Sequence, residues 1–92
     1  MNMKRQRYAV VNRGKETQLT PQEHQLLQYL MRNRTSAVST RQLTEQALGM
    51  SYDPASRQVE ALVFKLRKKM GHTLIKDHPG YGYQIEEQAV VA

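Results

Sequence analysis

The 92 residues are enough for one folded domain and too few for two, because a second unit would have no core of its own. With 14 Lys and Arg against 8 Asp and Glu, the net charge of +6 favours a polyanionic partner, either nucleic acid or an acidic membrane surface. The absence of cysteine excludes disulfides and thiolate metal sites, and apolar runs of four residues fall far short of the roughly 20 that span a membrane, so we expect a cytoplasmic protein.

The N-terminal part predicts a basic arm followed by a β-hairpin. Residues 1–7 carry three cationic side chains and almost no apolar ones. Residues 8–11 are rich in strand formers, residues 12–15 supply turn chemistry, and a second short strand over residues 16–19 closes the hairpin.

A first helix is predicted from residue 20 onward. Thr20 can cap it, Pro21 suits the first helical position, and Glu23 completes a capping box. Leucines then recur at helical spacing, and we expect the helix to end near Asn33. These leucines are Leu26, Leu27 and Leu30.

Two further helices follow. Ser39 or Thr40 can cap a short second helix, which the glycine at position 49 ends. Its inward side chains are Leu43, Ala47 and Leu48. Asp53 and Pro54 repeat the pattern of a cap followed by proline, so the third helix is predicted over about residues 54–70, with Gly71 as its stop.

The C-terminal part predicts a second hairpin. Residues 74–75 form a strand, residues 80–82 a tight turn and residues 83–85 the returning strand, with a frayed tail over residues 86–92. The order is hairpin, three helices, hairpin. The fold class is therefore α+β, with a helical trio flanked by small sheets in a single domain over residues 1–92.

The third helix is half apolar and half cationic. At 100° per residue one narrow stripe is apolar, with Leu62 at its edge. The stripe consists of Val59, Val63, Leu66 and Met70. The opposite face presents Arg57, Ala61, Phe64 and Lys68, with Lys65 on one flank and Glu60 and Arg67 on the other. A small residue among cations suits close approach to a polyanion, although a solvated charged face is the plainer explanation for such a helix taken alone.

Five motifs in one order strengthen the nucleic-acid interpretation. They are LTPQE at 19–23, VS at 38–39, SRQV at 56–59, LRKKMG at 66–71 and GYGY at 80–83. In order and spacing they resemble the OmpR/PhoB-type winged-helix effector domain of bacterial response regulators. The similarity runs from about Tyr8 to Ile85, which is nearly the whole chain.

The resemblance implies specific roles on double-stranded DNA. The third helix corresponds to the family's recognition helix, the second hairpin to its wing, and the loop from Gly49 to Asp53 to its RNA polymerase-contacting loop. We expect base contacts from Glu60, Ala61, Phe64 and Lys65, and phosphate contacts from Arg57, Arg67, Lys68, Lys69, Thr40 and Arg41. Wing contacts are expected from Lys76, His78 and Tyr81. A homodimer on DNA is a further expectation, and no cofactor is implied.

The sequence also departs from the family pattern. Leu62 and Phe64 replace a common His and Arg, Pro79 replaces an Arg at the wing, and Asp77 stands where a small hydroxyl residue is common. Asp77 would repel phosphate, although Lys76 or His78 can partly substitute for the lost wing contact. One N-terminal hairpin replaces four strands. No receiver domain is present, so we expect either an excised domain or a stand-alone regulator.

Three functions remain open at this point. The first is sequence-specific transcriptional regulation at the nucleoid. The second is a protein–protein module in which Phe64 and Leu62 form an apolar contact and DNA binding is weak or lost, and the third is non-specific coating of nucleic acid by charge alone. No Ser–His–acid grouping and no metal-ligand spacing of histidines is visible, so we expect no enzyme and no metal site.

Overall fold

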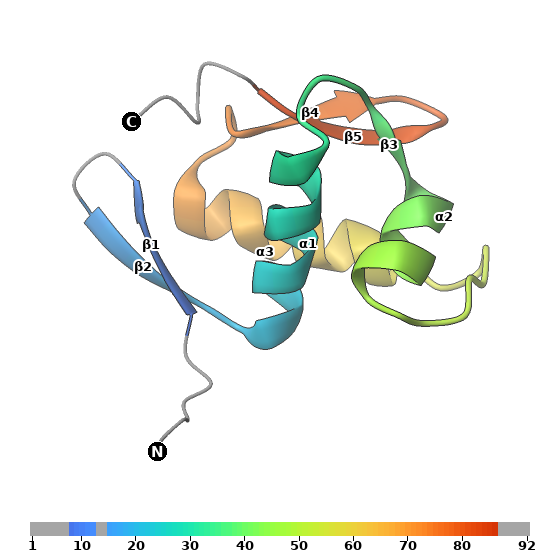
Figure 1. The fold of residues 1–92 in the computed structure, drawn as a ribbon, viewed down its shortest axis with the longest axis horizontal. Coiled ribbons are helices and arrows are strands. Elements are labelled where there is room, and N and C mark those ends of the chain that lie inside the picture. Colours follow the sequence, from blue (N-terminus) through green and yellow to red (C-terminus); the bar gives the residue numbers. More distant parts are fainter. Residues whose placement is uncertain (1–7, 13–14, 87–92) are drawn as a thin grey trace.

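The computed structural model describes residues 8–12 and 15–86, and Figure 1 shows their arrangement. The basic arm at 1–7, the turn at 13–14 and the tail at 87–92 lie outside the described residues. In chain order the elements are β1 (Tyr8–Asn12), β2 (Lys15–Leu19), α1 (Pro21–Arg32), β3 (Val38–Ser39), α2 (Thr40–Gln42), η1 (Leu43–Ala47, one π-helical turn), α3 (Gln58–Met70), β4 (Ile75–His78) and β5 (Gly82–Ile85). The predicted α+β class and element order are confirmed.

Both predicted hairpins form, and both are antiparallel. In the first, Tyr8 lies opposite Leu19 and Asn12 opposite Lys15. This hairpin stands beside the C-terminal end of α3, away from the second sheet (Figure 1).

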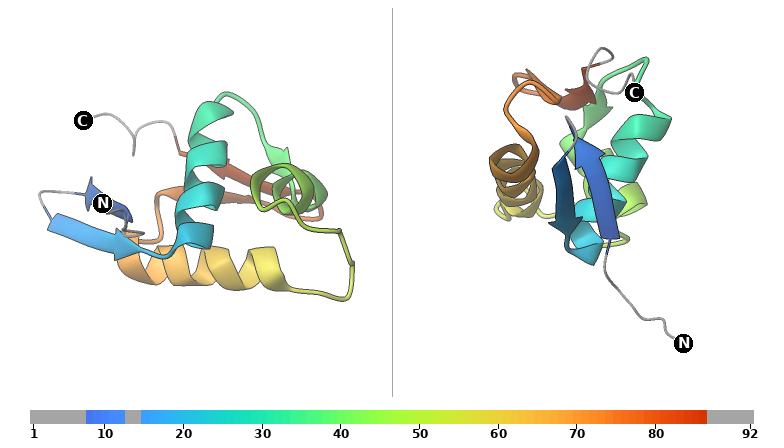
Figure 2. Two further views of the ribbon diagram at one scale, coloured as in Figure 1. Left: turned by 60° about the horizontal axis from the view of Figure 1, so that its bottom comes forward. Right: turned by 90° about the vertical axis from the view of Figure 1, so that its left-hand side faces the viewer.

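Helix α1 begins as the sequence predicts. The N–H of Glu23 donates to Thr20 Oγ1 at 3.2 Å, and the N–H of Thr20 donates to Glu23 Oε1 at 2.9 Å, so the capping box is closed. Asn33 caps the other end by donating its N–H to the carbonyls of Tyr29 and Leu30. The helix stands across α3, as Figure 2 shows, so the leucine side of α1 meets the apolar stripe of α3.

The second helical segment occupies the predicted stretch, with Leu43, Ala47 and Leu48 on the core, but it is more irregular than predicted. Ser39 caps α2 by accepting from the N–H of Gln42 at 3.0 Å, but the chain then widens into the π-helical turn η1, where the N–H of Leu48 donates to Leu43 O. The hydroxyl of Thr44 donates to Thr40 O at 2.9 Å. A side chain that donates to a carbonyl four residues earlier competes with the backbone ladder and bends a helix.

Helix α3 starts four residues later than predicted, and the prediction of a cap at Asp53 is wrong. The carboxylate of Asp53 accepts from the N–H of Ala55 at 3.0 Å, and its carbonyl accepts from the N–H of Ser56 at 2.9 Å. These bonds close a local turn, and the helix begins at Gln58 with Arg57 as its cap residue. An Asp–Pro pair initiates a turn by the same hydrogen bonds with which it starts a helix.

The second hairpin belongs to a three-stranded sheet of order β3-β5-β4. Strand β3 was not predicted; in it Val38 pairs with Tyr83 and Ser39 with Gly82. A Cβ atom at Gly82 would overlap the carbonyl oxygen of Val38, so glycine is what lets the two strands approach. Gly80 has φ +76° and forms the tight turn between β4 and β5.

One apolar core joins these elements. All four members of the predicted α3 stripe face it, Met70 at its edge, and Leu62 is 5% exposed and packs there as well. Leu62 is therefore a core residue and cannot take part in the apolar surface contact that the protein–protein interpretation assigned to it. Among the described helices, none is long and apolar enough to cross a membrane.

Candidate nucleic-acid interface

The outward face of α3 carries the side chains that the helical phase predicts. Ala61, Lys65 and Lys68 are exposed, and Phe64 is 60% exposed. The ammonium of Lys68 lies 5.2 Å from the centre of the Phe64 ring. This face thus offers a small central residue, two lysines and one aromatic ring to whatever binds it.

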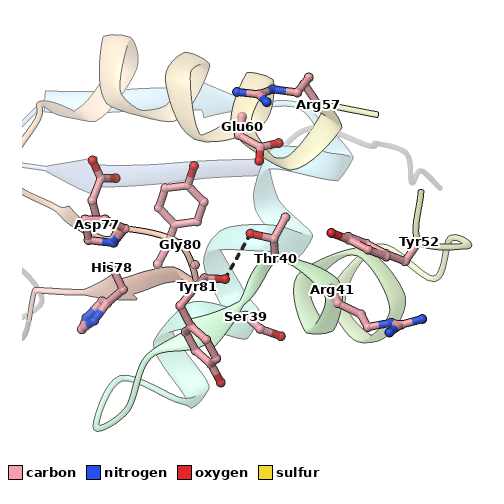
Figure 3. A pocket seen from close by; sticks show the side chains of 13 residues that line it. Ser39, Thr40, Arg41, Tyr52, Arg57, Glu60, Asp77, His78, Gly80 and Tyr81 are labelled. Atoms are coloured by element: carbon pink, nitrogen blue, oxygen red, sulfur yellow. Dashed lines mark hydrogen bonds between the residues drawn. The ribbon is translucent and has the colours of Figure 1, made fainter. Parts of the chain in front are cut away.

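Beside this face runs an open groove of about 630 Å³ between the start of α3, the start of α2 and the turn of the second hairpin. Figure 3 shows Glu60 extending from α3 toward the strands, with Arg57 above it. Oxygen Oε1 of Glu60 is buried and has no hydrogen-bond partner among the described residues. An unpaired buried carboxylate oxygen is costly, so the Glu60 carboxylate would be stabilised by turning to meet a hydrogen-bond donor in the groove.

The start of α2 forms the second wall of the groove. Thr40 donates its N–H and its hydroxyl to the carbonyl of Tyr81, at 3.0 and 3.3 Å, and so fixes the hairpin turn against α2 (Figure 3). Arg41 pairs with Glu45 at 3.3 Å and lies 5.1 Å over the ring of Tyr52, which follows Met50 in the predicted polymerase loop. The predicted phosphate contacts at Thr40 and Arg41 therefore lie next to the wing.

The wing residues are spread over the outer side of the small sheet. Lys76 is exposed on β4, and Tyr81 is 54% exposed at the turn, where Figure 3 shows its ring pointing away from α3. His78 is half-buried and shares a hydrogen bond of 2.8 Å with Gln84. Of the three predicted wing contacts, Lys76 and Tyr81 are the accessible ones.

Arg67 lies on the side of α3 that faces the second hairpin, and strand β4 of this hairpin binds its guanidinium. Its Nη2 donates to the carbonyl of Ile75 at 2.9 Å and to the carboxylate of Asp77 at 2.7 Å. The guanidinium carbon lies 5.8 Å from the centre of the Tyr83 ring. The sequence pointed to Asp77 as a residue that repels phosphate, but gave no sign that it binds a cation of the recognition helix.

Tyr83 closes the inner end of the groove. Burial raises the pKa of its hydroxyl above the ordinary value of 10.0, and the carboxylates of Glu60 and Asp77 raise it further, against the opposing effect of Arg67 and Arg57. The hydroxyl therefore remains protonated and able to donate a hydrogen bond throughout the physiological range.

Lys69 lies apart from the other predicted contacts, at the base of α1. Its ammonium donates to Glu23 Oε1 at 2.6 Å and to the carbonyl of Gln18 at 3.1 Å. The side chain of Glu23 is 1% exposed, so Lys69 neutralises a buried carboxylate and joins α3 to β2 and α1. The ammonium of Lys69 therefore binds other residues of the fold and does not face a ligand.

Taken together, the predicted site residues divide into two groups. Most gather on one side of the molecule, around the groove and the outward face of α3. This group contains Arg57, Glu60, Ala61, Phe64, Lys65, Lys68, Thr40, Arg41, His78 and Tyr81. Lys76 is exposed on β4 and does not line the groove. Arg67 and Lys69 form the second group, in which each cation of α3 is bound by a carboxylate of another element. Arg41 is also paired, but with Glu45 four residues along its own segment.

Residues 14–85 match the family model described as "Transcriptional regulatory protein, C terminal". The transcriptional regulatory protein CutR of Streptomyces coelicolor is 41% identical over 80 residues, covering 86% of this chain and 37% of CutR. The response regulator protein PmrA of Pseudomonas aeruginosa is 37% identical over 76 residues, covering 83% of this chain and 34% of PmrA. The chain thus spans little more than a third of the length of these relatives.

Two solved structures share the fold. The DNA-binding domain of Bacillus subtilis CssR superimposes with a TM-score of 0.73 at 26% identity, covering 85% of this chain and 90% of the CssR domain. The DNA-binding domain of CpxR from E. coli gives a TM-score of 0.70 at 28% identity, covering 78% of this chain and 76% of the CpxR domain.

Proposed function

The chain belongs to the OmpR/PhoB-type winged-helix DNA-binding domains of transcriptional regulatory proteins, and from this membership we propose that it binds specific duplex sequences with α3 in the major groove. The observation that carries the proposal is the outward face of α3, where Ala61 lies exposed between Lys65 and the cap residue Arg57, neither of which forms an ion pair with another described residue. A helix enters the major groove only where no bulky side chain holds it off.

The proposed contacts fall into base readers and phosphate holders. Lys65 suits the acceptor edge of guanine, Glu60 suits the amino group of cytosine, and Phe64 suits a thymine methyl group, with Ala61 allowing their approach. Phosphate contacts are proposed for cations at the rim and for the Thr40 hydroxyl, which would exchange its 3.3 Å bond to the Tyr81 carbonyl for a phosphate oxygen. Such contacts fix the register without reading sequence. These are Arg57, Lys68, Thr40 and Arg41, with Lys76 and Tyr81 reaching the backbone from the wing.

Further partners follow from the same arrangement. The loop at 49–53 is largely exposed, with Met50 38% exposed, and lies beside the start of α3, where a polymerase subunit meets a DNA-bound activator of this family. We propose RNA polymerase contact for this loop, and a second copy on an adjacent half-site as the DNA-bound state. A domain in this role acts at the bacterial nucleoid, in the cytoplasm.

The exposed Phe64 is the one observation that favours a protein–protein module instead. A ring that is 60% exposed on a helix meant for DNA is also suited to an apolar pocket of another protein. However, Leu62 is buried in the core and does not extend the apolar surface around the Phe64 ring. The ammonium of Lys68 also lies over this ring. The balance favours DNA.

A salt titration tests the proposal. The site is first selected from a random duplex pool, and its affinity is then compared with that of a scrambled duplex at several salt concentrations. If roughly four phosphates are neutralised, the log–log slope should be about −3.6. Specific binding should exceed scrambled binding by a factor of about 10³ or more. Equal affinity for both duplexes would favour coating by charge, and no binding to either would favour the protein–protein module.

A further inference from the structure

Arg67 is the one predicted phosphate holder whose charge is already matched from the wing. A single nitrogen, Nη2, donates both to the Ile75 carbonyl and to the Asp77 carboxylate, at 2.9 and 2.7 Å. The side chain of Arg67 is 21% exposed, whereas that of Asp77 is 60% exposed. The pair therefore sits at the edge of the groove, with the carboxylate on its solvent side.

The fold keeps Arg67 in place independently of Asp77. The Ile75 carbonyl and the Tyr83 ring both belong to the strands on which the guanidinium rests. Nε of Arg67 is buried and has no hydrogen-bond partner among the described residues, so the pocket does not satisfy the guanidinium fully. Asp77 is the exchangeable partner, because its side chain is exposed, an exposed ion pair is weak, and a phosphate oxygen can bind the same N–H.

We propose that Asp77 competes with the DNA backbone for Arg67. In the free protein the carboxylate occupies the position of a phosphate oxygen, and Arg67 binds the DNA backbone only to the extent that a phosphate displaces Asp77. This inference rests on the proposed function and adds that Asp77 lowers the affinity of the chain for duplex DNA. Because phosphate contacts carry no sequence information, Asp77 lowers affinity for all duplexes alike and leaves the preference among them unchanged.

Asp77→Asn is the direct test, since asparagine has the same shape and keeps an oxygen for Arg67 but has no charge. Affinity should rise about two- to fivefold on both the selected and the scrambled duplex. The salt slope should become steeper by about 0.9, the increment for one additional phosphate contact. Asp53→Asn is the matched control, because it removes one negative charge on an exposed loop and keeps the oxygen that accepts from Ala55.

The same substitution on an Arg67→Met background separates competition from simple repulsion. Competition requires the gain to disappear when Arg67 is absent, leaving Asp77→Asn no better than Asp53→Asn. A gain that persists on this background would show that Asp77 only repels phosphate, and would overturn the inference. Thermal melts of each variant establish that the fold is retained.

A phosphate scan keeps the test decisive if Arg67→Met does not fold. Single phosphates of the selected duplex are replaced one at a time by neutral methylphosphonates. The gain from Asp77→Asn should vanish at one position, where the freed Arg67 binds, and a gain that survives at every position would overturn the inference.

If the unaltered chain binds no duplex, the proposed function fails, and the inference fails with it. If the unaltered chain binds and Asp77→Asn has the same affinity as Asp53→Asn, only the competition fails.

Discussion

Neighbouring cations on α3 differ in whether a carboxylate of the chain binds them. Lys65 and Lys68 point outward from the helix, and the ion pairs among the described residues include neither. Arg67 and Lys69 flank Lys68 in sequence, yet each is bound by a carboxylate of another element, at 2.7 Å in Asp77 and 2.6 Å in Glu23. Helical phase separates the two groups, because a step of one residue turns a side chain by about 100°.

The contrast shows why the net charge overstates the electrostatic contact with DNA. A cation bound to a buried carboxylate stabilises the fold and releases no counterions when DNA arrives. A cation bound to an exposed carboxylate is intermediate, since the pair can be exchanged. Of the three consecutive cations at 67–69, only Lys68 forms no ion pair among the described residues, and its ammonium lies over the Phe64 ring.

The largest effect is expected from Lys69→Met, which would remove the cation that neutralises the buried Glu23 carboxylate and leave the N–H of Thr20 as the donor to Oε1 among the described residues. The free energy of unfolding should fall by about 3 kcal/mol. Chemical denaturation measures this loss, and Lys68→Met, one residue earlier and exposed, is the matched control with a change of less than about 0.5 kcal/mol. A Lys69 variant with unchanged stability and a shallower salt slope would place Lys69 on the DNA and break the comparison.

Lys65 sharpens the comparison within the outward group. Lys65→Ala should reduce discrimination at one or two base pairs by about 1–3 kcal/mol, because a base contact is lost. Lys68→Ala should weaken binding to all duplexes alike, because it holds a phosphate. Titrations of both variants against the selected site and its single-base variants decide this. Equal losses on selected and scrambled duplexes for both variants would contradict the division of roles.

Local features of the fold were predictable from the sequence because neighbouring residues determine them. The capping box of α1 and the tight turn at Gly80 depend on residues a few positions apart, and both are present. The helical phase of α3 also placed Phe64 outside and Val59 inside. Such features depend on residues close together in the chain, and the periodic spacing of those residues in the sequence is enough to predict them.

The remaining features depend on contacts between distant elements. Glu23 and Lys69 are 46 positions apart, and no spacing rule connects them. Strand β3 has two residues, too few to show an alternating pattern, and exists because β5 pairs with it. The start of α3 was misplaced because the hydrogen bonds of Asp53 serve a turn as well as a cap. The role of Asp77 also required the structure, since it depends on where Arg67 lies.

The smallest effect on stability is expected from Phe64→Ala, and it tests the helical phase on which the whole comparison rests. With 60% of its surface exposed, Phe64 should cost less than about 1 kcal/mol of unfolding free energy when truncated. Leu62→Ala is the matched control, because Leu62 is 5% exposed and a cavity in its place should cost about 2–5 kcal/mol.

The same variant then distinguishes what the ring binds. If Phe64 meets DNA, Phe64→Ala should lower affinity most at sites with a thymine beneath α3, since only thymine offers a methyl group there. Self-association, measured by sedimentation, should stay the same. A variant that keeps its DNA affinity and loses an oligomer would assign the ring to a protein contact. A melt that collapses like that of Leu62→Ala would mean that Phe64 is buried in solution, and Lys65 and Lys68 could not then both lie on the outward face of α3.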